Sequence, residues 1–359
     1  NQIYCVRSYL SDTQLGCALN LATEAQKGWS QTKIKSRLAI CEAMLGYFER
    51  NQNDIAEELS WQMGRPCFQA LHELRVMADR ARYMMSIAES SLQSIFIEES
   101  PEFHRFIKRD PWGVVFVIAP WNYPYLTAIN SIIPAILAGN SVLLKHSSQT
   151  PLCGERFAKA FESTELPKGV FQSLLLDYNQ VAKLIDNDVV QYVIFTGSVS
   201  GGKRVQLAAN NRFIPIGLEL GGKDPAYVRA DADINNAVEN LVDGAFFNSG
   251  QSCCGIERIY VDEHCYDDFV SAYVDKARQY NLGNPFDEGI DLGPMVSIGA
   301  ANNARKQIRD ALGSGAKALL PFENYDCYDS SYLAPQVLVN VNHKMSMMRE
   351  ESFAPIIGI

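Results

Sequence analysis

The stretch GVVFVIAPWNYP, residues 113–124, joins an apolar run to a turn that contains Trp, Asn and two prolines. Its first eight residues are rich in Val and Ile, which favour strands, and none of them is charged. A strand that is apolar on both faces is typical of a parallel sheet covered by helices on both sides. This stretch therefore indicates the interior of an α/β protein.

Similar apolar runs, separated by helical stretches, continue along the chain after this strand. Further apolar runs rich in Val, Ile and Leu occupy residues 141–147, 172–177 and 190–197. Stretches with helical spacing separate the runs, at 124–138, 152–163, 179–186 and 201–209. Apolar strands alternating with helices predict a parallel sheet, and residues 19–93 before it read as helical because apolar residues recur at helix spacing.

The pattern then restarts. Residues 214–228 read as a strand, a Gly turn and another strand, and a helix follows with Asp233 as its expected N-cap. Between the two regions, residues 94–112 alternate like a two-stranded ribbon that is interrupted at Ser100-Pro101. We therefore predict one domain formed by residues 1–93 and 113–220, a ribbon at 94–112, and a second α/β domain at 221–359.

Composition excludes several classes of protein. The 359 residues are 47% hydrophobic, which allows more than one domain, and the net charge of -9 offers no basic surface for nucleic acid or an anionic membrane. Every apolar run is far too short to cross a bilayer. The nine Cys are scattered and odd in number, which favours a reducing compartment such as the cytoplasm over a disulfide framework. No Cys-x-x-Cys pair exists and the five His lack ligand spacing, so we expect no metal site.

Two stretches in the first region end a strand with polar residues. Asn122 lies at the carboxyl end of the first apolar strand, where it caps a helix or directs its amide at a developing oxyanion. FTGSVSGGKRV, residues 195–205, ends a strand in Gly197-Ser198 and continues into a helix. Glycines there either turn the chain or let the backbone approach a phosphate at the helix N-terminus.

Two stretches further on could carry reactive groups. LELGGK, residues 218–223, places Glu219 in an apolar strand, where we expect burial to raise its pKa toward that of a general base. The alternative is a Glu that bonds to backbone N–H groups of the Gly turn. GQSCCGIER, residues 250–258, places Cys253 and Cys254 side by side, as buried packing, a metal site, a disulfide fragment or a nucleophile.

Taken together, these motifs resemble the aldehyde dehydrogenase superfamily. PWN (120–122), LLK (143–145), FTGS (195–198), LELGGK, GQSC (250–253) and EESFAP (350–355) occur in the family's order and at its separations. The resemblance implies a Rossmann-like cofactor domain (1–93 and 113–220), an oligomerisation ribbon (94–112) and a catalytic domain (221–359) that lacks the family's C-terminal part. It also implies a homodimer or homotetramer.

The resemblance assigns a catalytic role to three residues. Cys253 is the nucleophile that attacks the aldehyde, whereas Cys254 is a small neighbour. The side-chain amide of Asn122 and the backbone N–H of Cys253 hold the oxyanion. Glu219 activates the water that hydrolyses the thioester, which favours release of a free acid over transfer to coenzyme A.

Cofactor contacts follow from the same resemblance. It implies that Trp121, Lys145, Gly197 and Ser198 contact the adenosine and phosphate part, and that Glu351 and Phe353 contact the nicotinamide ribose. NAD-specific members often carry a Glu three residues after the strand lysine, and this chain has Ser148 there. A Ser does not repel a 2′-phosphate, so we expect NADP to be accepted beside or before NAD.

The substrate is defined less well by the sequence. The helix after Asn122, YPYLTAINSIIPAIL, carries no Arg or Lys, whereas branches that oxidise succinic semialdehyde often place an Arg near Asn130. This absence argues against an acidic substrate. Succinic semialdehyde nevertheless stays among the expected substrates, beside other small aliphatic or aromatic aldehydes. The alternatives are a non-catalytic scaffold with the same fold and a reductase of acyl phosphates or acyl thioesters, which needs no Glu219.

Overall fold

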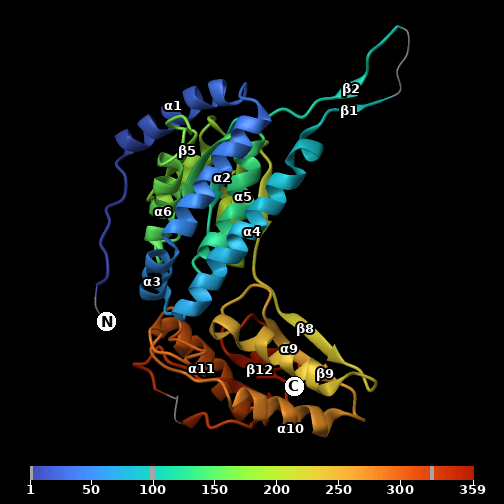
Figure 1. Cartoon of the computed structure of the whole chain (residues 1–359). Coiled ribbons are helices and arrows are strands. Elements are labelled where there is room, and N and C mark those ends of the chain that lie inside the picture. Colours follow the sequence, from blue (N-terminus) through green and yellow to red (C-terminus); the bar gives the residue numbers. More distant parts are fainter. Residues whose placement is uncertain (1–2, 98–101, 324–326) are drawn as a thin grey trace. The chain divides into compact units, whose positions relative to one another are not determined.

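A computed structural model describes residues 3–97, 102–323 and 327–359. By their contacts, residues Asn1–Glu58 and Leu71–Leu220 form a first unit, and Leu59–Ala70 and Gly221–Ile359 form a second. Figure 1 shows the elements of both units, each of which is described by itself below.

The first unit is built on a 5-stranded sheet in which every neighbouring pair is parallel, with the order β5-β4-β3-β6-β7. Its strands are β3 (Val114–Ile118), β4 (Ser141–Lys145), β5 (Phe171–Ser173), β6 (Val190–Thr196) and β7 (Ile216–Glu219). The chain builds outward from β3 to β5 and then returns to the other side of β3. This reversal creates a switch point between β3 and β6, where open α/β sheets bind ligands.

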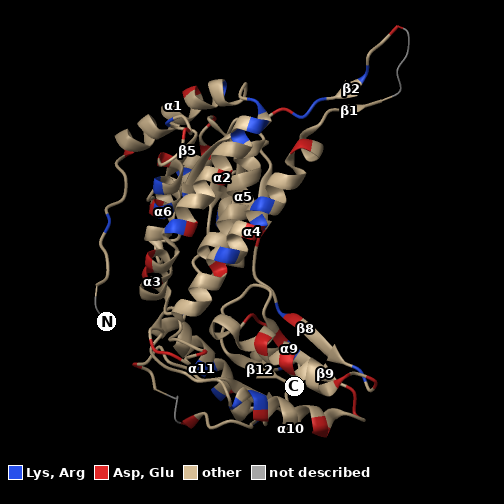
Figure 2. Ribbon diagram, viewed as in Figure 1, with Lys and Arg blue, Asp and Glu red and all other residues tan. Residues whose placement is uncertain are grey.

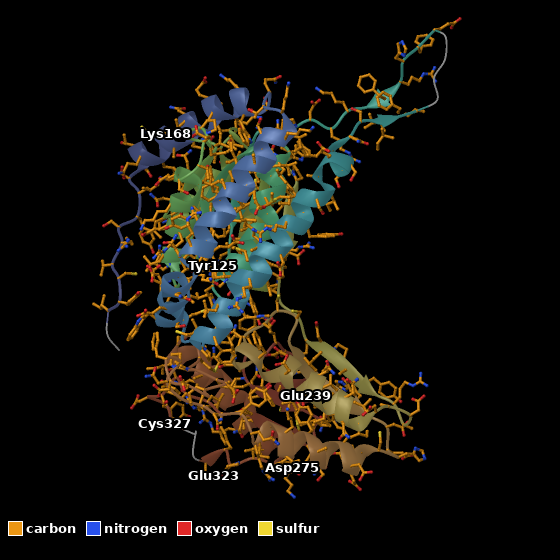
Figure 3. All side chains as sticks on the ribbon, viewed as in Figure 1. Tyr125, Lys168, Glu239, Asp275, Glu323 and Cys327 are labelled. Atoms are coloured by element: carbon orange, nitrogen blue, oxygen red, sulfur yellow. The ribbon has the colours of Figure 1, made fainter. Side chains whose placement is uncertain are left out.

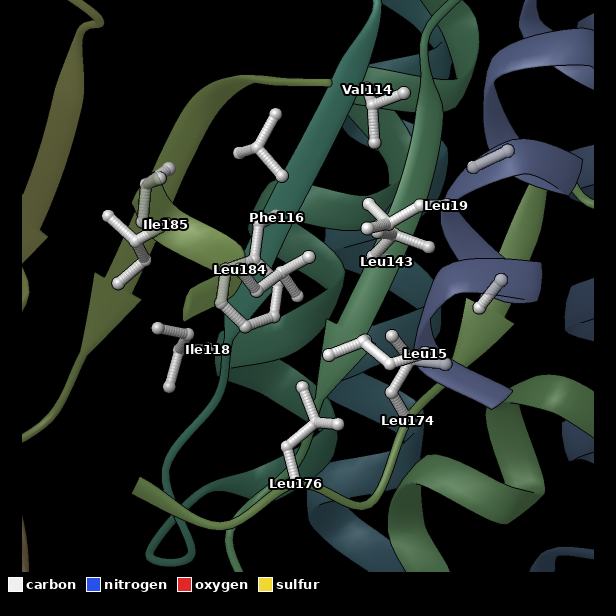
Figure 4. Close-up of a cluster of buried hydrophobic side chains, with 14 of the residues drawn as sticks. Leu15, Leu19, Val114, Phe116, Ile118, Leu143, Leu174, Leu176, Leu184 and Ile185 are labelled. Atoms are coloured by element: carbon white, nitrogen blue, oxygen red, sulfur yellow. The ribbon is translucent and has the colours of Figure 1, made fainter. Parts of the chain in front are cut away.

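Helices cover both faces of this sheet. On one face, α1 (Asp12–Trp29), α7 (Tyr178–Asp186) and α8 (Val199–Ala208) bury alternate side chains of β3, as Figure 4 shows for Phe116 between Leu184 and Leu143. On the other face, α5 (Pro124–Leu137) packs on β3 and β4. α2 (Ile34–Arg50) packs on α5, α6 (Pro151–Glu162) packs on β5, and α2 and α6 pack on each other. Residues 114–118 are all buried, as the opening stretch of sequence predicted.

The helical region expected at 19–93 is confirmed as helix and is divided into α1, α2, α3 (Gln52–Met63) and α4 (Cys67–Leu92). Between α3 and α4 the chain turns at Gly64, whose φ of +82° is accessible to glycine, and Pro66 follows. This turn belongs by its contacts to the second unit, so α3 and α4 each contribute residues to both units.

The second unit contains its own 5-stranded sheet, with the order β10-β11-β12-β9-β8. The strands are β8 (Asp224–Val228), β9 (Ile256–Val261), β10 (Lys317–Ala318), β11 (Gln336–Val339) and β12 (Ile356–Gly358). One cluster of buried side chains joins it to α9 (Ile234–Phe246) and α10 (Tyr266–Ala277), and another to α11 (Ile298–Gly313). Asp233 accepts a hydrogen bond from the N–H of Asn236, which confirms it as the N-cap of α9.

A short ribbon leaves the first unit after α4. β1 (Ile95–Phe96) and β2 (Phe106–Ile107) pair antiparallel, as expected from the alternating sequence. The predicted interruption at Ser100-Pro101 lies outside the described residues. Both strands are exposed on both faces, including Phe96 with 75% of its surface accessible.

Charged residues of both signs alternate on the helices of the first unit, as Figure 2 shows for α2, α4 and α6. Over residues 3–97, 102–323 and 327–359, every helix is too short or too polar to traverse a bilayer.

Candidate active site

The carboxyl edge of the first sheet gathers several of the predicted site residues. Lys145 is the last residue of β4 and pairs in register with Ile118 of β3, which pairs in turn with Phe195 of β6. Thr196 of β6 pairs with Glu219, the last residue of β7. Trp121 and Asn122 follow β3, and Gly197 and Ser198 follow β6, so all of these residues leave the sheet at the same edge.

The turn after β6 opens the N-terminus of α8 to a ligand. Ser198 is its N-cap, and its Oγ accepts a hydrogen bond from the N–H of Gly201 at 3.2 Å. A Cβ atom at Gly197 or Gly201 would lie 2.7 or 2.6 Å from the Phe195 ring, so both positions need glycine for packing. Since Ser198 is exposed and the helix N-terminus favours anions, this turn fits the phosphates of a dinucleotide.

Lys145 ends β4, and Ser148 lies on the loop between β4 and α6. The side chain of Lys145 is half-buried, and this desolvation lowers its pKa below the ordinary range. Ser148 is exposed three residues further on. The donor set of an ammonium and a hydroxyl therefore suits a ribose or a phosphate oxygen, in agreement with a nucleotide at this edge.

Asn122 is 5% exposed and does not cap α5. The N-cap of α5 is Tyr123, and its side chain makes no capping hydrogen bond. The capping interpretation of Asn122 is therefore wrong, because the helix begins one residue later than that interpretation requires. The oxyanion interpretation of Asn122 stays a prediction.

A residue that the sequence analysis missed supplies the cap of α5. The Oε1 atom of Glu73, on α4, accepts hydrogen bonds from the N–H groups of Tyr125 at 2.9 Å and Leu126 at 3.0 Å. Glu73 is 3% exposed and Tyr125 is fully buried in the first unit, where Figure 3 labels it. Glu73 lies 49 positions before Asn122 in the sequence, so no local pattern could have pointed to it.

His146 fixes the same helix start from the other side. Its Nε2 atom donates to the carbonyl oxygen of Pro124 at 3.1 Å, and its Nδ1 atom accepts from Oγ1 of Thr150 at 3.2 Å. A neutral ring with its proton on Nε2 makes both hydrogen bonds. Burial lowers the pKa of His146 to about 4, so the ring stays neutral at pH 7.

Glu219 differs from the expectation. The sequence predicted a buried carboxylate with a raised pKa, but the side chain of Glu219 is exposed. The physical reason is that β7 is an edge strand of its sheet and Glu219 is its last residue. An exposed carboxylate has direct access to water, as hydrolysis of a thioester requires. The expected burial of Glu219 was wrong, so burial does not support its role as a general base, which stays a prediction.

In the second unit, strained backbone leads into the two thiols. The 3₁₀ turn Phe247–Gly250 after α9 contains Asn248 and Ser249 with φ values of 55° and 56°, which non-glycine residues rarely adopt. Buried hydrogen bonds hold this turn. Arg65 donates to Oδ1 of Asn248 at 3.0 Å, and Oε1 of Gln251 accepts from the N–H of Val296 at 2.9 Å. Such strain persists where the surroundings over-determine the backbone, and it often marks a functional site.

Cys253 and Cys254 are both exposed at the end of this loop, which argues against buried packing. Their thiols are hydrogen-bonded to each other. This bond, with a second from Ser252, lowers the pKa of Cys254 to about 5, whereas the bond to Cys254 raises that of Cys253. The thiolate of the pair thus forms first on Cys254, and the role of Cys253 as the nucleophile stays a prediction.

Glu351 and Phe353 lie on the segment that enters β12. Oε1 of Glu351 accepts a hydrogen bond from the N–H of Gly222 at 3.1 Å, and burial of its carboxyl raises its pKa. Phe353 has a φ of +50°. A Cβ atom at Gly222 would lie 2.8 Å from the carbonyl oxygen of Cys253, so the Gly turn contacts both the Cys loop and Glu351.

All nine Cys lie in the described ranges and none of them forms a disulfide, and within those ranges His, Cys, Asp and Glu side chains form no group of three or more suited to a metal ion. Asn122, Lys145 and Glu219 belong to the first unit, and Cys253, Glu351 and Phe353 belong to the second.

Comparison with known proteins agrees with the motifs. The sequence model of the aldehyde dehydrogenase family matches residues 2–359, and the chain therefore belongs to this family. It is 31% identical over 346 residues to a D-glyceraldehyde dehydrogenase (NADP(+)) of Picrophilus torridus, covering 95% of this chain and 70% of the relative.

Other relatives include a second kind of dehydrogenase and solved structures. A succinate-semialdehyde dehydrogenase [NADP(+)] 1 of Mycobacterium tuberculosis is 30% identical over 354 residues, covering 97% of this chain and 77% of the relative. The glyceraldehyde-3-phosphate dehydrogenase GapN of Methanocaldococcus jannaschii, complexed with NADP, is 29% identical with a TM-score of 0.92. That alignment covers 100% of this chain and 78% of the solved chain. The expected α/β fold of this family is confirmed.

Proposed function

We propose that this protein oxidises a small aldehyde to the carboxylic acid with NADP+ or NAD+, through a covalent adduct on Cys253. The observation that carries the proposal is the exposure of Cys253 at the end of the strained Phe247–Gly250 turn, with its carbonyl oxygen against the Gly turn that also binds Glu351. A thiolate at neutral pH is the form that attacks a carbonyl carbon.

The proposed chemistry uses three side chains. The Cys253 sulfur forms a bond to the aldehyde carbon, and the carbonyl oxygen becomes an oxyanion held by the Asn122 amide and the Cys253 N–H. Bound NADP+ or NAD+ supplies the acceptor for the hydride that leaves this carbon. Glu219 then takes a proton from water as its oxygen attacks the thioester. The carbon–sulfur bond breaks, and the free acid and the Cys253 thiolate result.

The carboxyl edge of the first sheet fits the nucleotide. Ser198 and the N-terminus of α8 would bind the phosphates, Gly197 would let them approach the backbone, and Trp121 and Lys145 would contact the adenosine half. Ser148 leaves room for a 2′-phosphate, and the relatives described above carry NADP in their names. Glu351 and Phe353 would contact the nicotinamide ribose.

The side chain of Arg80 changes the expectation about the substrate. Its Nε atom donates to Oδ1 of Asn130 at 2.8 Å, and its guanidinium lies 5.5 Å from the centroid of the Tyr83 ring. α4 therefore supplies, beside Asn130, the positive charge that α5 lacks. We propose a short aldehyde with a polar or anionic distal group, in line with the semialdehyde and glyceraldehyde named for relatives.

The ribbon and the cysteines support two further parts of the proposal. The exposed apolar side chains of residues 95–97 and 103–107 suit burial against a second copy of the chain, which we propose as a homodimer or homotetramer. Nine cysteines that form no disulfide suit a reducing compartment, and we propose the cytoplasm.

A dehydrogenase assay of purified protein with a panel of aldehydes, NADP+ and NAD+ tests this function. We expect aldehyde-dependent reduction of the cofactor, abolished by Cys253→Ala and largely retained by Cys254→Ala. Arg80→Met should raise KM for succinic semialdehyde and leave KM for a neutral aldehyde unchanged. No activity with any aldehyde would favour the non-catalytic scaffold. Activity only in the direction of acyl phosphate or thioester reduction would favour the reductase.

A further inference from the structure

The turn at Ser352 and Phe353 in the second unit is held by a buried carboxylate to which the proposed chemistry gives no role. Glu257, on β9, is 4% exposed. Its Oε2 atom accepts a hydrogen bond from the N–H of Ser352 at 2.7 Å, and its Oε1 atom accepts from the N–H of Phe353 at 3.0 Å. A single side chain thus binds two successive backbone donors at the residue with the positive φ.

Lys223 completes this arrangement from the Gly turn. Its Nζ atom lies 2.5 Å from Oε2 of Glu257 and donates to Oγ of Ser352 at 3.0 Å. The side chains of Lys223 and Glu257 are 9% and 5% exposed, so the ion pair is almost fully buried. Desolvation lowers the pKa of Lys223, and the carboxylate of Glu257 opposes that shift.

Further contacts join the same network to both ends of the proposed site. Oγ of Ser352 donates to Oε1 of Gln307 at 2.7 Å, and Nε2 of Gln307 donates to the carbonyl oxygen of Glu351 at 3.4 Å. Glu257 lies four residues after Cys253, and Lys223 directly follows Gly222, which donates to Glu351. The pair therefore connects the Cys loop, the Gly turn and the segment of Glu351 within one unit.

A buried ion pair adds little to stability over a well-packed apolar pair, so stability gives a weak reason for its presence. It does impose one geometry on its partners. Phe353 occupies a backbone conformation that is unfavourable for a bulky residue, and the two hydrogen bonds from Glu257 compensate for that cost.

We propose that Glu257 and Lys223 are positioning residues that fix the Ser352–Phe353 turn, and with it Glu351, in the conformation that binds the nicotinamide ribose. The inference rests on the proposed function, since it requires that Glu351 and Phe353 contact the cofactor. Their loss weakens cofactor binding, and the chemistry of Cys253 itself is retained.

The test compares Glu257→Gln with the double variant Lys223→Met/Glu257→Gln. The single variant offers one acceptor oxygen in place of two and leaves Lys223 buried without its counterion, so we expect it to fold poorly. The double variant removes both charges and avoids that penalty. The matched control is Lys276→Met/Glu239→Gln, which removes an ion pair of 2.6 Å between α10 and α9 in the same unit, whose side chains are 30% and 66% exposed.

The measured quantities are the dissociation constant of NADP+ from titration calorimetry, KM for NADP+, and kcat per reactive thiol. For the double variant we expect the dissociation constant and KM to rise about tenfold, the loss expected from a charge-assisted hydrogen bond, with kcat per reactive thiol changed much less. A purely structural role would lower the folded fraction and leave both constants of the folded fraction unchanged.

The outcomes separate this inference from the function on which it rests. Wild-type affinity and KM in the double variant overturn the inference and leave the proposed function intact. Wild-type protein that binds neither NADP+ nor NAD+ overturns both. Weakened binding in the control as well as in the double variant also overturns the inference, because the effect would then belong to any lost ion pair of this unit.

Discussion

The carboxylate of Glu73 accepts a hydrogen bond from the N–H of Tyr125 at 2.9 Å, and the same oxygen accepts a second from Leu126. The first turn of α5 thus takes its cap from α4, since its own N-cap Tyr123 provides none. A carboxylate at a helix N-terminus is also favoured by the helix dipole. The backbone that leads from Asn122 into α5 is fixed by this interaction.

Replacement of Glu73 by Ala should therefore lower both stability and activity. Two buried N–H groups lose their acceptor, and we expect a loss of about 2 kcal/mol in the free energy of unfolding. We also expect kcat to fall because the Asn122 amide is no longer held, while Glu73→Gln should recover part of both. Denaturant unfolding and steady-state kinetics measure the two effects. Glu89→Ala, an exposed change on the same helix, is the control, and equal losses in both variants would contradict the capping role.

His146 predicts a pH dependence of stability. Its pKa in the folded protein is about 4, below the 6.5 of an unperturbed His, because the ring is buried. As pH falls below 6.5 the unfolded chain takes up the proton first, so stability falls from pH 6.5 until it levels near pH 4. The shift corresponds to about 3 kcal/mol.

His146→Gln should flatten this part of the stability curve, because Gln has no proton to gain. Denaturant unfolding at pH 7 and at pH 4.5 measures the difference for the wild type, for this variant and for His104→Gln, an exposed control. The same decrease in all three proteins would show that other groups cause the acid sensitivity.

The sequence alone predicts some features of the fold and of the candidate site, and it does not predict others. The apolar pattern of residues 114–118 predicted a buried strand correctly because that pattern is local. The burial of Glu219 was predicted wrongly, since a single strand does not reveal that it will lie at a sheet edge.

The contacts of the side chains were beyond the sequence for a related reason. Glu73 meets Tyr125 and Arg80 meets Asn130 across 52 and 50 positions. Such pairs depend on how two helices pack, which no periodicity encodes. Glu257 lies next to a recognised motif, but its backbone partners lie 95 and 96 positions later.

The hydrogen-bonded thiols predict a pH profile for alkylation. The first proton leaves the pair at a pKa of about 5 in Cys254, well below that of an ordinary thiol, because the second thiol stabilises the thiolate. In Cys254→Ala the hydrogen bond that raises the pKa of Cys253 is lost, so the inflection in the alkylation of Cys253 should move to lower pH than in the wild type. Iodoacetamide labelling of the peptide that contains both residues, followed by mass spectrometry, measures the rates. An unchanged inflection in the variant would show that the two thiols do not share a proton.

Ser148 predicts the cofactor preference. The wild type should use NADP+ at least as well as NAD+, and Ser148→Glu should lower kcat/KM for NADP+ about tenfold or more, because like charges repel at close range. The kcat/KM for NAD+ should change little. Ser163→Glu, at the opposite end of α6, is the matched control. A wild type that uses NAD+ far better than NADP+ would contradict this account of Ser148.

The most direct test of the central claim is to trap the covalent adduct. Glu219→Gln removes the proposed base, so incubation with NADP+ and a substrate aldehyde should leave an acyl group attached to the enzyme. Fragmentation of the 246–258 peptide by mass spectrometry then locates the added mass. The account predicts that it is on Cys253. An adduct on Cys254, or turnover by this variant at the wild-type rate with no adduct, would contradict it.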